Sequence, residues 1–340
     1  MLSGELEPTT GEVVITPGER MAVLRQNHFE FDSYEVLQTV IMGHKRLYEI
    51  MKEKDELYAK EDFTEEDGDR AGQLESEFAE LNGWEAESDA SKLIQGLGLS
   101  EDILYSQMST LSGNEKVKVL LAQALFGNPD IIMLDEPTNH LDFETLMWLE
   151  DYLKGYKGAI IIVSHDRYFL NKVCTRICEI EQGRLTSYRG DYSSYLVQKQ
   201  MNSERQLKEY EAQQKEIAKL EDYVAKNLVR ASTSKMAKSR QHMLDRIERI
   251  DKPLMYTKPP KIKLEYDIEP TKDIVRVVDC PLVVGEGADK KELIKSLTMN
   301  VRRGEHVAII GANGIGKTSI LKLIQGIIPP VSYTHLTLPT

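Results

Sequence analysis

Two short apolar runs near the middle of the chain have the pattern of strands that are buried on both faces. "IIML" spans 131–134 and "AIIIV" spans 159–163, and polar residues do not alternate with apolar ones in either run. Buried strands of this kind belong to parallel sheets, and the helical stretch between the runs supplies the crossover connection. A further helix is predicted over 115–126, where "GNPD" ends it. The pattern therefore predicts an α/β fold.

A helical and markedly acidic segment runs from about Leu47 to Leu99. Its most acidic part, "KEDFTEEDGDR", lies between two helix-like stretches, and residues 1–43 before it mix short β-like runs with turns. We interpret the segment as an inserted helical arm, at about 44–100, whose acidic side chains form a solvated face.

From about Leu196 to Asp251 the composition changes to Lys, Arg, Glu and Gln, and apolar residues recur at helical spacing. One stripe is Leu207, Tyr210, Ile217, Leu220, Val224 and Leu228, and the other is Met236, Met243, Ile247 and Ile250. The small polar "ASTS" between the stripes suits a turn, so the segment is predicted to be a helical hairpin. The proline-rich "KPLMYTKPP" ends it, and the strand-like "IVRVV" begins a new element at about Asp273.

The composition is that of a globular protein, and it limits the possible partners. The 340 residues can hold two ordinary domains, with 41% hydrophobic and 29% charged residues. The net charge of -12 argues against a protein that coats nucleic acid with its whole surface, but allows a local basic patch. No apolar run approaches the roughly 18 residues that span a bilayer. The N-terminus lacks a signal-peptide pattern, and the three cysteines lack metal-binding spacing. We expect a cytoplasmic protein with no membrane partner.

Residues 311–318, "GANGIGKT", match the phosphate-binding pattern G-x-x-x-x-G-K-[ST] without a gap. The apolar "HVAII" precedes the loop as a strand would, and the helix-like "SILKLI" follows it. Glycines let backbone N–H groups point at phosphate oxygens, and the helix N-terminus adds partial positive charge. Lys317 is predicted to reach the β- and γ-phosphates of ATP, and the Thr318 hydroxyl to ligate Mg²⁺. The residues predicted to bind nucleotide here are Gly311, Asn313, Gly314, Gly316, Lys317, Thr318 and Ser319.

The stretch "IIMLDEPTNHLD", residues 131–142, is an apolar strand that ends in two carboxylates. At the carboxyl end of a strand, Asp135 suits a Mg²⁺-bound water, and Glu136 suits a base that orients or deprotonates the attacking water. Taken alone, the two acids could equally cap the start of a helix.

Three further positions gain weight from their order along the chain. In "LSGNE", residues 111–115, Ser112 is a natural N-cap, and nearby backbone N–H groups could hold a phosphate. His165 in "SHD" lies just past the second buried strand, where loop residues face ligands, and Gln26 in "LRQN" follows another β-like run. Each alone has a structural explanation, such as a simple capped helix or a structural histidine.

In this order the motifs resemble the ATP-binding cassette (ABC) family over residues 1–330, and more narrowly the ABC-F class of tandem-cassette translation factors. "DEPTNHLD" is the most diagnostic stretch, because transporter cassettes usually carry another dipeptide at Asn139-His140. "SHDRYFLNKVC" and the acidic arm resemble the YbiT-like branch. The resemblance implies these roles in the first cassette. Gln26 is the Q-loop glutamine, for catalysis and Mg²⁺, and Ser112 and Gly113 belong to the signature. Asp135 and Glu136 are the Walker B pair, Asp142 belongs to the D-loop, and His165 is the switch histidine. The loop 311–318 becomes the Walker A motif of the second cassette.

The resemblance also implies the domain organisation: a P-loop ABC cassette with an inserted helical arm, then a helical-hairpin linker and the start of a second cassette. The expected ranges are 1–195 for the first cassette without its Walker A, 196–262 for the linker and 263–330 for the second cassette. Residues 331–340, "VSYTHLTLPT", resemble the translation of a transposase adapter used in preparing sequencing libraries, so we expect them to be an artefact. An ordinary disordered tail is the alternative for the last ten residues.

Two positions depart from the family pattern. Asn114 stands where the signature usually has glycine. Asparagine tolerates a left-handed backbone, so we expect the signature to survive with altered phosphate contact. "CPLVVGEGADKK" before the second P-loop has no aromatic residue, although the family often stacks adenine on one there.

Two short segments, one at each end of the chain, have similar sequences. "MLSGELEP", residues 1–8, and "LIQGIIPP", residues 323–330, share Gly at the fourth place and Pro at the eighth. If both mark the same point in two copies of one fold, the chain is a slice of a tandem parent whose first P-loop lies upstream of Met1. In the parent the two cassettes pair within one molecule, and each ATP lies between the Walker motifs of one and the signature of the other. Since each site would then lack parts that act as a unit, we expect feeble ATP hydrolysis by this chain alone.

A basic cluster surrounds the predicted turn of the hairpin, because no acidic residue lies between Asp222 and Asp245. The cluster consists of Lys226, Arg230, Lys235, Lys238 and Arg240. Cations gathered at a tip favour docking to phosphate, whereas a merely solvated hairpin is the alternative. The ABC-F resemblance implies that this linker reaches into the ribosome, toward rRNA and bound tRNA.

The favoured function is therefore an ABC-F ATPase that uses ATP and Mg²⁺ to act as a translation factor on the ribosome. The first rival is the ATP-binding subunit of a transporter; two cassettes on one chain, the charged hairpin and "TNHLD" speak against it. A DNA-repair ATPase of the cassette superfamily is a second rival, but it would carry longer coiled coils or zinc-binding cysteines.

Overall fold

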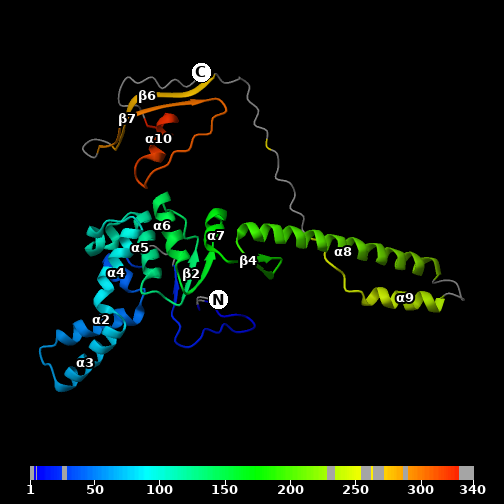
Figure 1. Ribbon diagram of the computed structural model, residues 1–340, viewed down its shortest axis with the longest axis horizontal. Coiled ribbons are helices and arrows are strands. Elements are labelled where there is room, and N and C mark those ends of the chain that lie inside the picture. Colours follow the sequence, from blue (N-terminus) through cyan, green and yellow to red (C-terminus); the bar gives the residue numbers. More distant parts are fainter. Residues whose placement is uncertain are drawn as a thin grey trace. The chain divides into compact units, whose positions relative to one another are not determined.

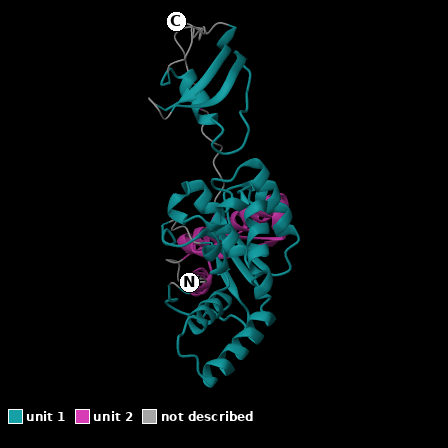
Figure 2. Cartoon of the chain, turned by 90° about the vertical axis from the view of Figure 1, so that its left-hand side faces the viewer, with its two compact units in different colours: residues 1–169, 266–340 teal, residues 170–265 magenta. Residues whose placement is uncertain are grey.

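The computed structural model describes most of the chain in two compact units. The described residues are 4, 6–24, 29–227, 234–253, 262, 272–285 and 290–328. One unit comprises residues 1–169 and 266–340, and the other comprises residues 170–265 (Figure 2). Predictions for Gln26, Arg230, the turn residues 231–233 and the tail 331–340 lie outside the described residues. The predicted domain boundaries stay predictions.

A three-stranded parallel sheet forms the centre of the first unit (Figure 1). Strand β2 (Ile131–Asp135) lies between β1 (Met21–Val23) and β3 (Ala159–Val163). Helix α6 (Phe143–Lys154) connects β2 to β3. Ile132 is fully buried in the central strand. The α/β fold, the parallel pairing and the crossover helix are confirmed.

The second apolar run is less covered than its composition predicts. In β3 the burial alternates, and Ile161 and Val163 are 41% and 58% exposed. The expectation of a strand buried on both faces was wrong here: the side chains of Ala159, Ile161 and Val163 share one face of β3, and that face is exposed in the structure.

Helices precede and follow the sheet strands along the chain. Before β2 they are α1 (Val36–Ile41), α2 (Lys45–Tyr58), α3 (Glu65–Glu80), α4 (Ala86–Gly96) and α5 (Gly113–Leu125), with short 3₁₀ helices at Gly83–Glu85, Glu101–Tyr105 and Met108–Thr110. After β3 comes α7 (Arg167–Val173). The predicted arm is present as the antiparallel pair α2 and α3, and α5 confirms the helix expected near 115–126.

The acidic residues of the arm do more than form a solvated face. Helix α3 begins inside the acidic run, where Thr64 and Asp67 form a capping box. The Glu75 carboxylate forms an ion pair with Lys54 of α2 at 2.9 Å, and Glu77 forms one with Arg46 of the same helix. Most acids of the arm are exposed, as expected of a solvated face, and Glu75 and Glu77 in addition join its two helices.

The second unit contains a β-hairpin followed by a helical hairpin. Strands β4 (Arg176–Glu181) and β5 (Arg184–Arg189) pair antiparallel, and α8 (Tyr192–Asn227) lies side by side with α9 (Ser234–Arg246) (Figure 1). The helical hairpin is confirmed. The side chain of Gln213 in α8 is hydrogen-bonded to the backbone that follows α9. Its amide N–H donates to the Glu248 carbonyl, and its amide oxygen accepts from the Ile250 N–H, each at 2.8 Å.

The segment around the predicted Walker A loop has a small core of its own. Antiparallel strands β6 (Asp273–Val284) and β7 (Lys291–Arg302) pack with helix α10 (Lys317–Ile324). Its buried residues are Val277, Cys280, Leu282, Ile320 and Leu323. The "IVRVV" strand is confirmed, whereas the predicted strand "HVAII" was wrong: this run has no strand partner within the described residues, and Ile310 is 85% exposed.

Candidate functional site

The strongest candidate site lies at the carboxyl ends of β2 and β3. Strand β2 ends at Asp135, and Glu136 follows with a left-handed backbone, φ +48°. The Glu136 N–H donates to the Val163 carbonyl at 2.8 Å, which fixes the turn to the end of β3. Left-handed backbone is unfavourable for a residue with a side chain, and such strain gathers at functional sites.

His165 brings a second functional group to the same place. Its Nε2 lies 3.7 Å from Oε1 of Glu136, and its own side chain is fully exposed. That Oε1 atom is buried and accepts no hydrogen bond from the described residues. A buried acceptor without a partner is uncommon, and it suits an oxygen that meets a ligand or a reacting water.

The loop that carries His165 is anchored at both sides. The Asp166 carboxylate accepts from the backbone N–H groups of Tyr168 at 2.9 Å and of Phe169 at 3.1 Å, which caps the start of α7. The Phe169 side chain is fully buried. The exposed histidine therefore stands on a short loop whose backbone is held by the strand before it and the helix after it.

The residues of the predicted signature lie at the start of α5, where the sequence predicts a helix N-cap. Ser112 is the N-cap, and it forms a capping box with Glu115, whose carboxylate accepts from the Ser112 N–H at 2.8 Å and hydroxyl at 2.7 Å. Gly113 and Asn114 are exposed in the first turn. Asn114 is helical, so its tolerance of a left-handed backbone is not used in this structure.

Asp142 is held at the start of α6. Its carboxylate accepts from the Thr145 N–H at 3.0 Å and pairs with Lys118 at 3.3 Å. Burial acts to raise the pKa of Asp142, but the Thr145 hydrogen bonds and Lys118 outweigh it and lower the pKa from 3.8 to about 2. The carboxylate is therefore ionised at neutral pH, and its oxygens are bound by Thr145 and Lys118 of the same chain.

The predicted Walker A loop has the backbone that its glycines require. Gly314 and Gly316 have φ of +82° and +110°, and a Cβ at Gly316 would lie 3.1 Å from the Leu293 side chain. The Lys317 ammonium donates to the carbonyls of Gly311 at 2.6 Å and Ala312 at 2.7 Å. The Lys317 side chain therefore lies against the backbone of its own loop.

The donor set of this loop fits the phosphates of ATP. The first turn of α10 has no side-chain cap, so its backbone N–H groups point out of the helix toward the loop. Thr318 and Ser319 of this turn would present hydroxyls to Mg²⁺ and phosphate. Asn313 donates its amide to the His140 carbonyl at 2.7 Å. Lys317 and the N–H groups together would hold the triphosphate.

Comparison with known proteins decides the family. The family model described as "ABC transporter" matches residues 1–139 and 294–336, and a second model with the same description matches residues 178–264. The chain belongs to the ATP-binding cassette family. The family that the motifs indicated is thereby confirmed.

The cassette protein is similar to curated bacterial proteins along almost its whole length. It is 45% identical to the uncharacterized ABC transporter ATP-binding protein YkpA of Bacillus subtilis, over 96% of this chain and 60% of YkpA. It is 39% identical to the probable ATP-binding protein YbiT of Escherichia coli O157:H7, over 98% of this chain and 62% of YbiT. It is 30% identical to the probable ATP-binding protein YheS of Haemophilus influenzae, over 98% of this chain and 51% of YheS. These relatives fit a YbiT-like ABC-F protein, and the chain spans about 60% of the length of the first two.

The basic residues of the cassette protein's hairpin differ in how they are held. Lys235 and Lys238 are exposed on α9. The Arg240 guanidinium lies 3.7 Å from the centre of the Tyr223 ring, a cation–π contact between the two helices. Lys226 forms an exposed ion pair with Asp222 at 2.8 Å. Among the described cations of this cluster, Lys235 and Lys238 are therefore the most accessible to an external partner.

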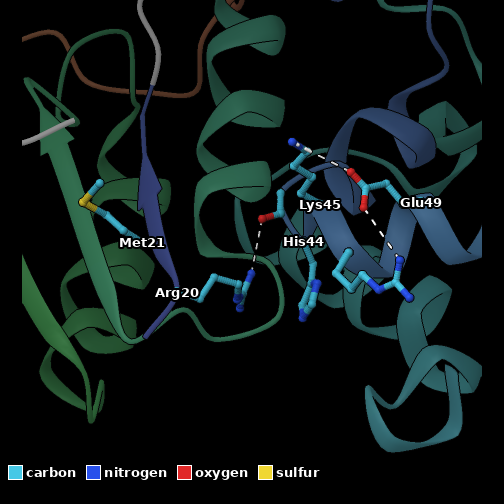
Figure 3. Close-up of a pocket in the computed structure, with 7 residues that line it drawn as sticks. Arg20, Met21, His44, Lys45 and Glu49 are labelled. Atoms are coloured by element: carbon cyan, nitrogen blue, oxygen red, sulfur yellow. Dashed lines mark hydrogen bonds and ion pairs between the residues drawn. The ribbon is translucent and has the colours of Figure 1, made fainter. Parts of the chain in front are cut away.

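A pocket of about 360 Å³ opens where β1 begins (Figure 3). Arg20 donates to the Gly43 carbonyl at 3.2 Å, and burial followed by the charge of Arg20 lowers the pKa of His44 beside it. Because Met21 pairs with Ile131 at the start of β2, this pocket lies at the opposite end of the strands from Asp135. It is not the predicted nucleotide site.

Within the described residues, none of the helices is both long enough and apolar enough to span a bilayer. The structure brings Asp135, Glu136 and His165 together, and it holds Lys317 within its own loop. Sequence reasoning missed the two lysines that α5 buries, Lys116 and Lys118. The signal was present in "KVKVLL", where two cations stand among the apolar residues of a core helix.

Proposed function

We propose that this ABC protein binds ATP with Mg²⁺, hydrolyses it at sites shared by two cassettes, and acts on the ribosome near tRNA as a cytoplasmic translation factor. The observation that carries the proposal is the Glu136 carboxylate, whose buried Oε1 lacks a hydrogen-bond partner in the described chain and faces His165 at 3.7 Å.

In this proposal each residue of the pair has a distinct role in hydrolysis. Glu136 accepts a proton or a hydrogen bond from the attacking water at Oε1, since that oxygen has a free acceptor position. His165, fully exposed on an anchored loop, donates toward the same reacting group. Bound Mg²⁺ would neutralise the charge that develops on the transferred phosphoryl oxygens. Asp135 at the end of β2 would orient a water on that ion.

The test of hydrolysis uses Glu136→Gln in a form of the protein that carries both cassettes. We expect the turnover number for ATP to fall by about 10²-fold or more, as for loss of a general base, while ATP binding remains. The matched control is Glu144→Gln, because Glu144 is exposed in the first turn of α6. Unchanged turnover in Glu136→Gln would contradict the proposed chemistry.

The ribosomal part of the proposal is supported by the charge distribution of the helical hairpin. Lys235 and Lys238 project from α9 without acidic neighbours in sequence, whereas Glu211 and Glu216 lie further from the tip on α8. An exposed cationic tip on a long helical pair can contact a phosphate backbone while the cassettes stay outside it. Closure on ATP would place this tip near tRNA, and hydrolysis would release it.

The partner is tested by co-sedimentation with ribosomes and, in parallel, with membranes. Lys235→Glu/Lys238→Glu should weaken ribosome binding, whereas the control pair Lys215→Glu/Lys219→Glu, with the same charge change further down α8, should not. If about four phosphates are contacted, fourfold higher salt weakens binding by roughly 10²-fold. Sedimentation with membranes alone would favour the transporter subunit instead.

A further inference from the structure

Helix α5, which begins at the signature, buries two lysines in its first two turns. Lys116 and Lys118 are only 5% and 4% exposed. Lysine is rarely buried unless its charge is paired. Residues two apart on a helix point to opposite sides, so the two cations extend from the same helix in different directions.

Lys116 is paired with the segment that follows the predicted Q-loop glutamine. Its ammonium forms an ion pair with Asp32, which lies 84 residues earlier in the sequence. The backbone reinforces this connection just before the signature, where the Met108 N–H donates to the Tyr34 carbonyl at 2.9 Å and the Ser109 N–H donates to the Asp32 carbonyl at 3.2 Å.

Lys118 is paired with the D-loop end of α6. Its ammonium lies 3.3 Å from Asp142 Oδ2 and donates to the Thr145 hydroxyl at 3.0 Å. The Thr145 hydroxyl in turn donates to the Leu97 carbonyl at 3.2 Å, at the end of α4. Asp142 is the N-cap of α6 and Thr145 lies in its first turn, so this cation joins the signature helix to the start of α6, which follows Glu136 in the sequence.

We propose that Lys116 and Lys118 are positioning residues that lock the signature helix to these two segments of its own cassette. The inference rests on the proposed function. Ser112 would act on the nucleotide held by the other cassette, whereas Gln26 and Glu136 would act on the nucleotide of their own. A change at one site therefore reaches the other through α5, and without the lysines Ser112 loses its defined position for hydrolysis.

The main test uses the apolar pair Lys116→Met/Asp32→Leu in a form of the protein with both cassettes. The Lys116 side chain is buried, whereas that of Asp32 is 35% exposed. A single Lys116→Met variant leaves Asp32 without its partner, whereas the double variant removes both charges together and leaves no unpaired ion. We expect an unchanged melting temperature, unchanged affinity for fluorescent ADP, which needs Lys317 but not Ser112, and a turnover number at saturating ATP that falls about tenfold.

The controls separate positioning from packing. Lys116→Arg and Lys118→Arg keep the charge and should retain turnover within about threefold, and Lys92→Met, which removes a cation that is 70% exposed on α4, should change nothing. Turnover that is unchanged in the folded apolar pair overturns the proposal. A parallel loss of ADP affinity, melting temperature and turnover overturns it too, because it indicates packing alone. If the unmodified protein does not hydrolyse ATP, the proposed function itself fails.

Discussion

His165 Nε2 lies 3.7 Å from Glu136 Oε1, and this approach joins the loops that follow β2 and β3 through two side chains of the predicted site. The histidine side chain is fully exposed, whereas the glutamate oxygen is buried. A fully exposed side chain contributes little to the stability of the fold. We therefore expect His165 to act in the reaction and not in folding.

The first prediction concerns His165→Ala. In a form of the protein with both cassettes, turnover of ATP should fall by about 10²-fold, because a positioned hydrogen-bonding group is lost next to Glu136. The melting temperature should stay unchanged, since the side chain is fully exposed. The control is His242→Ala, an exposed histidine of α9. Equal activity of the two variants would remove His165 from the mechanism.

The second prediction concerns the acid stability that Asp142 provides. Its pKa is about 2 in the folded protein against an ordinary 3.8. The folded state therefore gains stability above pH 3.8, about 2 kcal/mol at full ionisation, and this gain disappears as the pH falls through 2. Urea unfolding between pH 7 and pH 2 measures the effect.

Asp142→Asn isolates this contribution from those of other carboxylates. The variant should lose stability at pH 7 but show a shallower fall between pH 4 and 2 than the unmodified protein. Asp151→Asn on the same helix is the control, because the Asp151 side chain is 77% exposed. If both variants follow the same pH curve, the ion pair with Lys118 does not hold Asp142 ionised in the way the structure indicates.

The third prediction concerns Gly98, which lies two residues past the end of α4 and has a left-handed conformation with φ +71°. The Leu99 N–H donates to the Ile94 carbonyl, as in a Schellman motif. A Cβ at Gly98 would lie 3.2 Å from the Thr145 hydroxyl. Gly98→Ala should therefore lower the free energy of unfolding by about 1–2 kcal/mol.

Gly72 offers the opposite case for comparison in the same urea-unfolding experiment. It lies within α3, has no positive φ, and a Cβ there meets nothing within 4 Å. Gly72→Ala should therefore raise stability by about 0.5–1 kcal/mol. A neutral or stabilising Gly98→Ala would show that the contact with Thr145 relaxes at no cost.

Much of the fold follows from local patterns in the sequence. "IIML" and "AIIIV" predicted the parallel strands because they are short, continuous apolar runs. The two apolar stripes predicted α8 and α9 because their residues recur at helical spacing. Ser112 was recognisable as an N-cap from its place before an apolar helix. These features depend on near neighbours in sequence.

What the sequence could not predict depends on partners far away in the chain. The strand expected at "HVAII" fails because a strand needs a neighbour to pair with, and an apolar run alone does not provide one. Lys116 finds Asp32 across 84 residues, and Lys118 finds Asp142 across 24. Long-range pairs of this kind cannot be inferred from spacing, so these two ion pairs of α5 became visible only in the structure.

The fourth prediction concerns Gln213, whose side chain joins α8 to the backbone after α9. Gln213→Ala removes two hydrogen bonds of 2.8 Å, to Glu248 and Ile250. Each such bond contributes about 0.5–1.5 kcal/mol, so the hairpin should open more readily at this end. Hydrogen exchange of α9 amides measures it, with the same substitution at the neighbouring, half-buried Gln214 as the control. Equal protection in both variants would show that apolar packing around Ile217 suffices.

The fifth prediction concerns ATP hydrolysis by residues 1–330 alone. Glu136 is predicted to serve the nucleotide of the first cassette, whereas Lys317 is predicted to hold the nucleotide of the second. Groups that act as a unit lose most of their effect when separated between sites. ATP should therefore bind to this chain in a way that Lys317→Ala abolishes, yet phosphate release should be slow and insensitive to Glu136→Gln. Fast, Glu136-dependent turnover by the purified chain would mean that both residues serve one nucleotide, and the assignment of the lysine loop to a second cassette would be wrong.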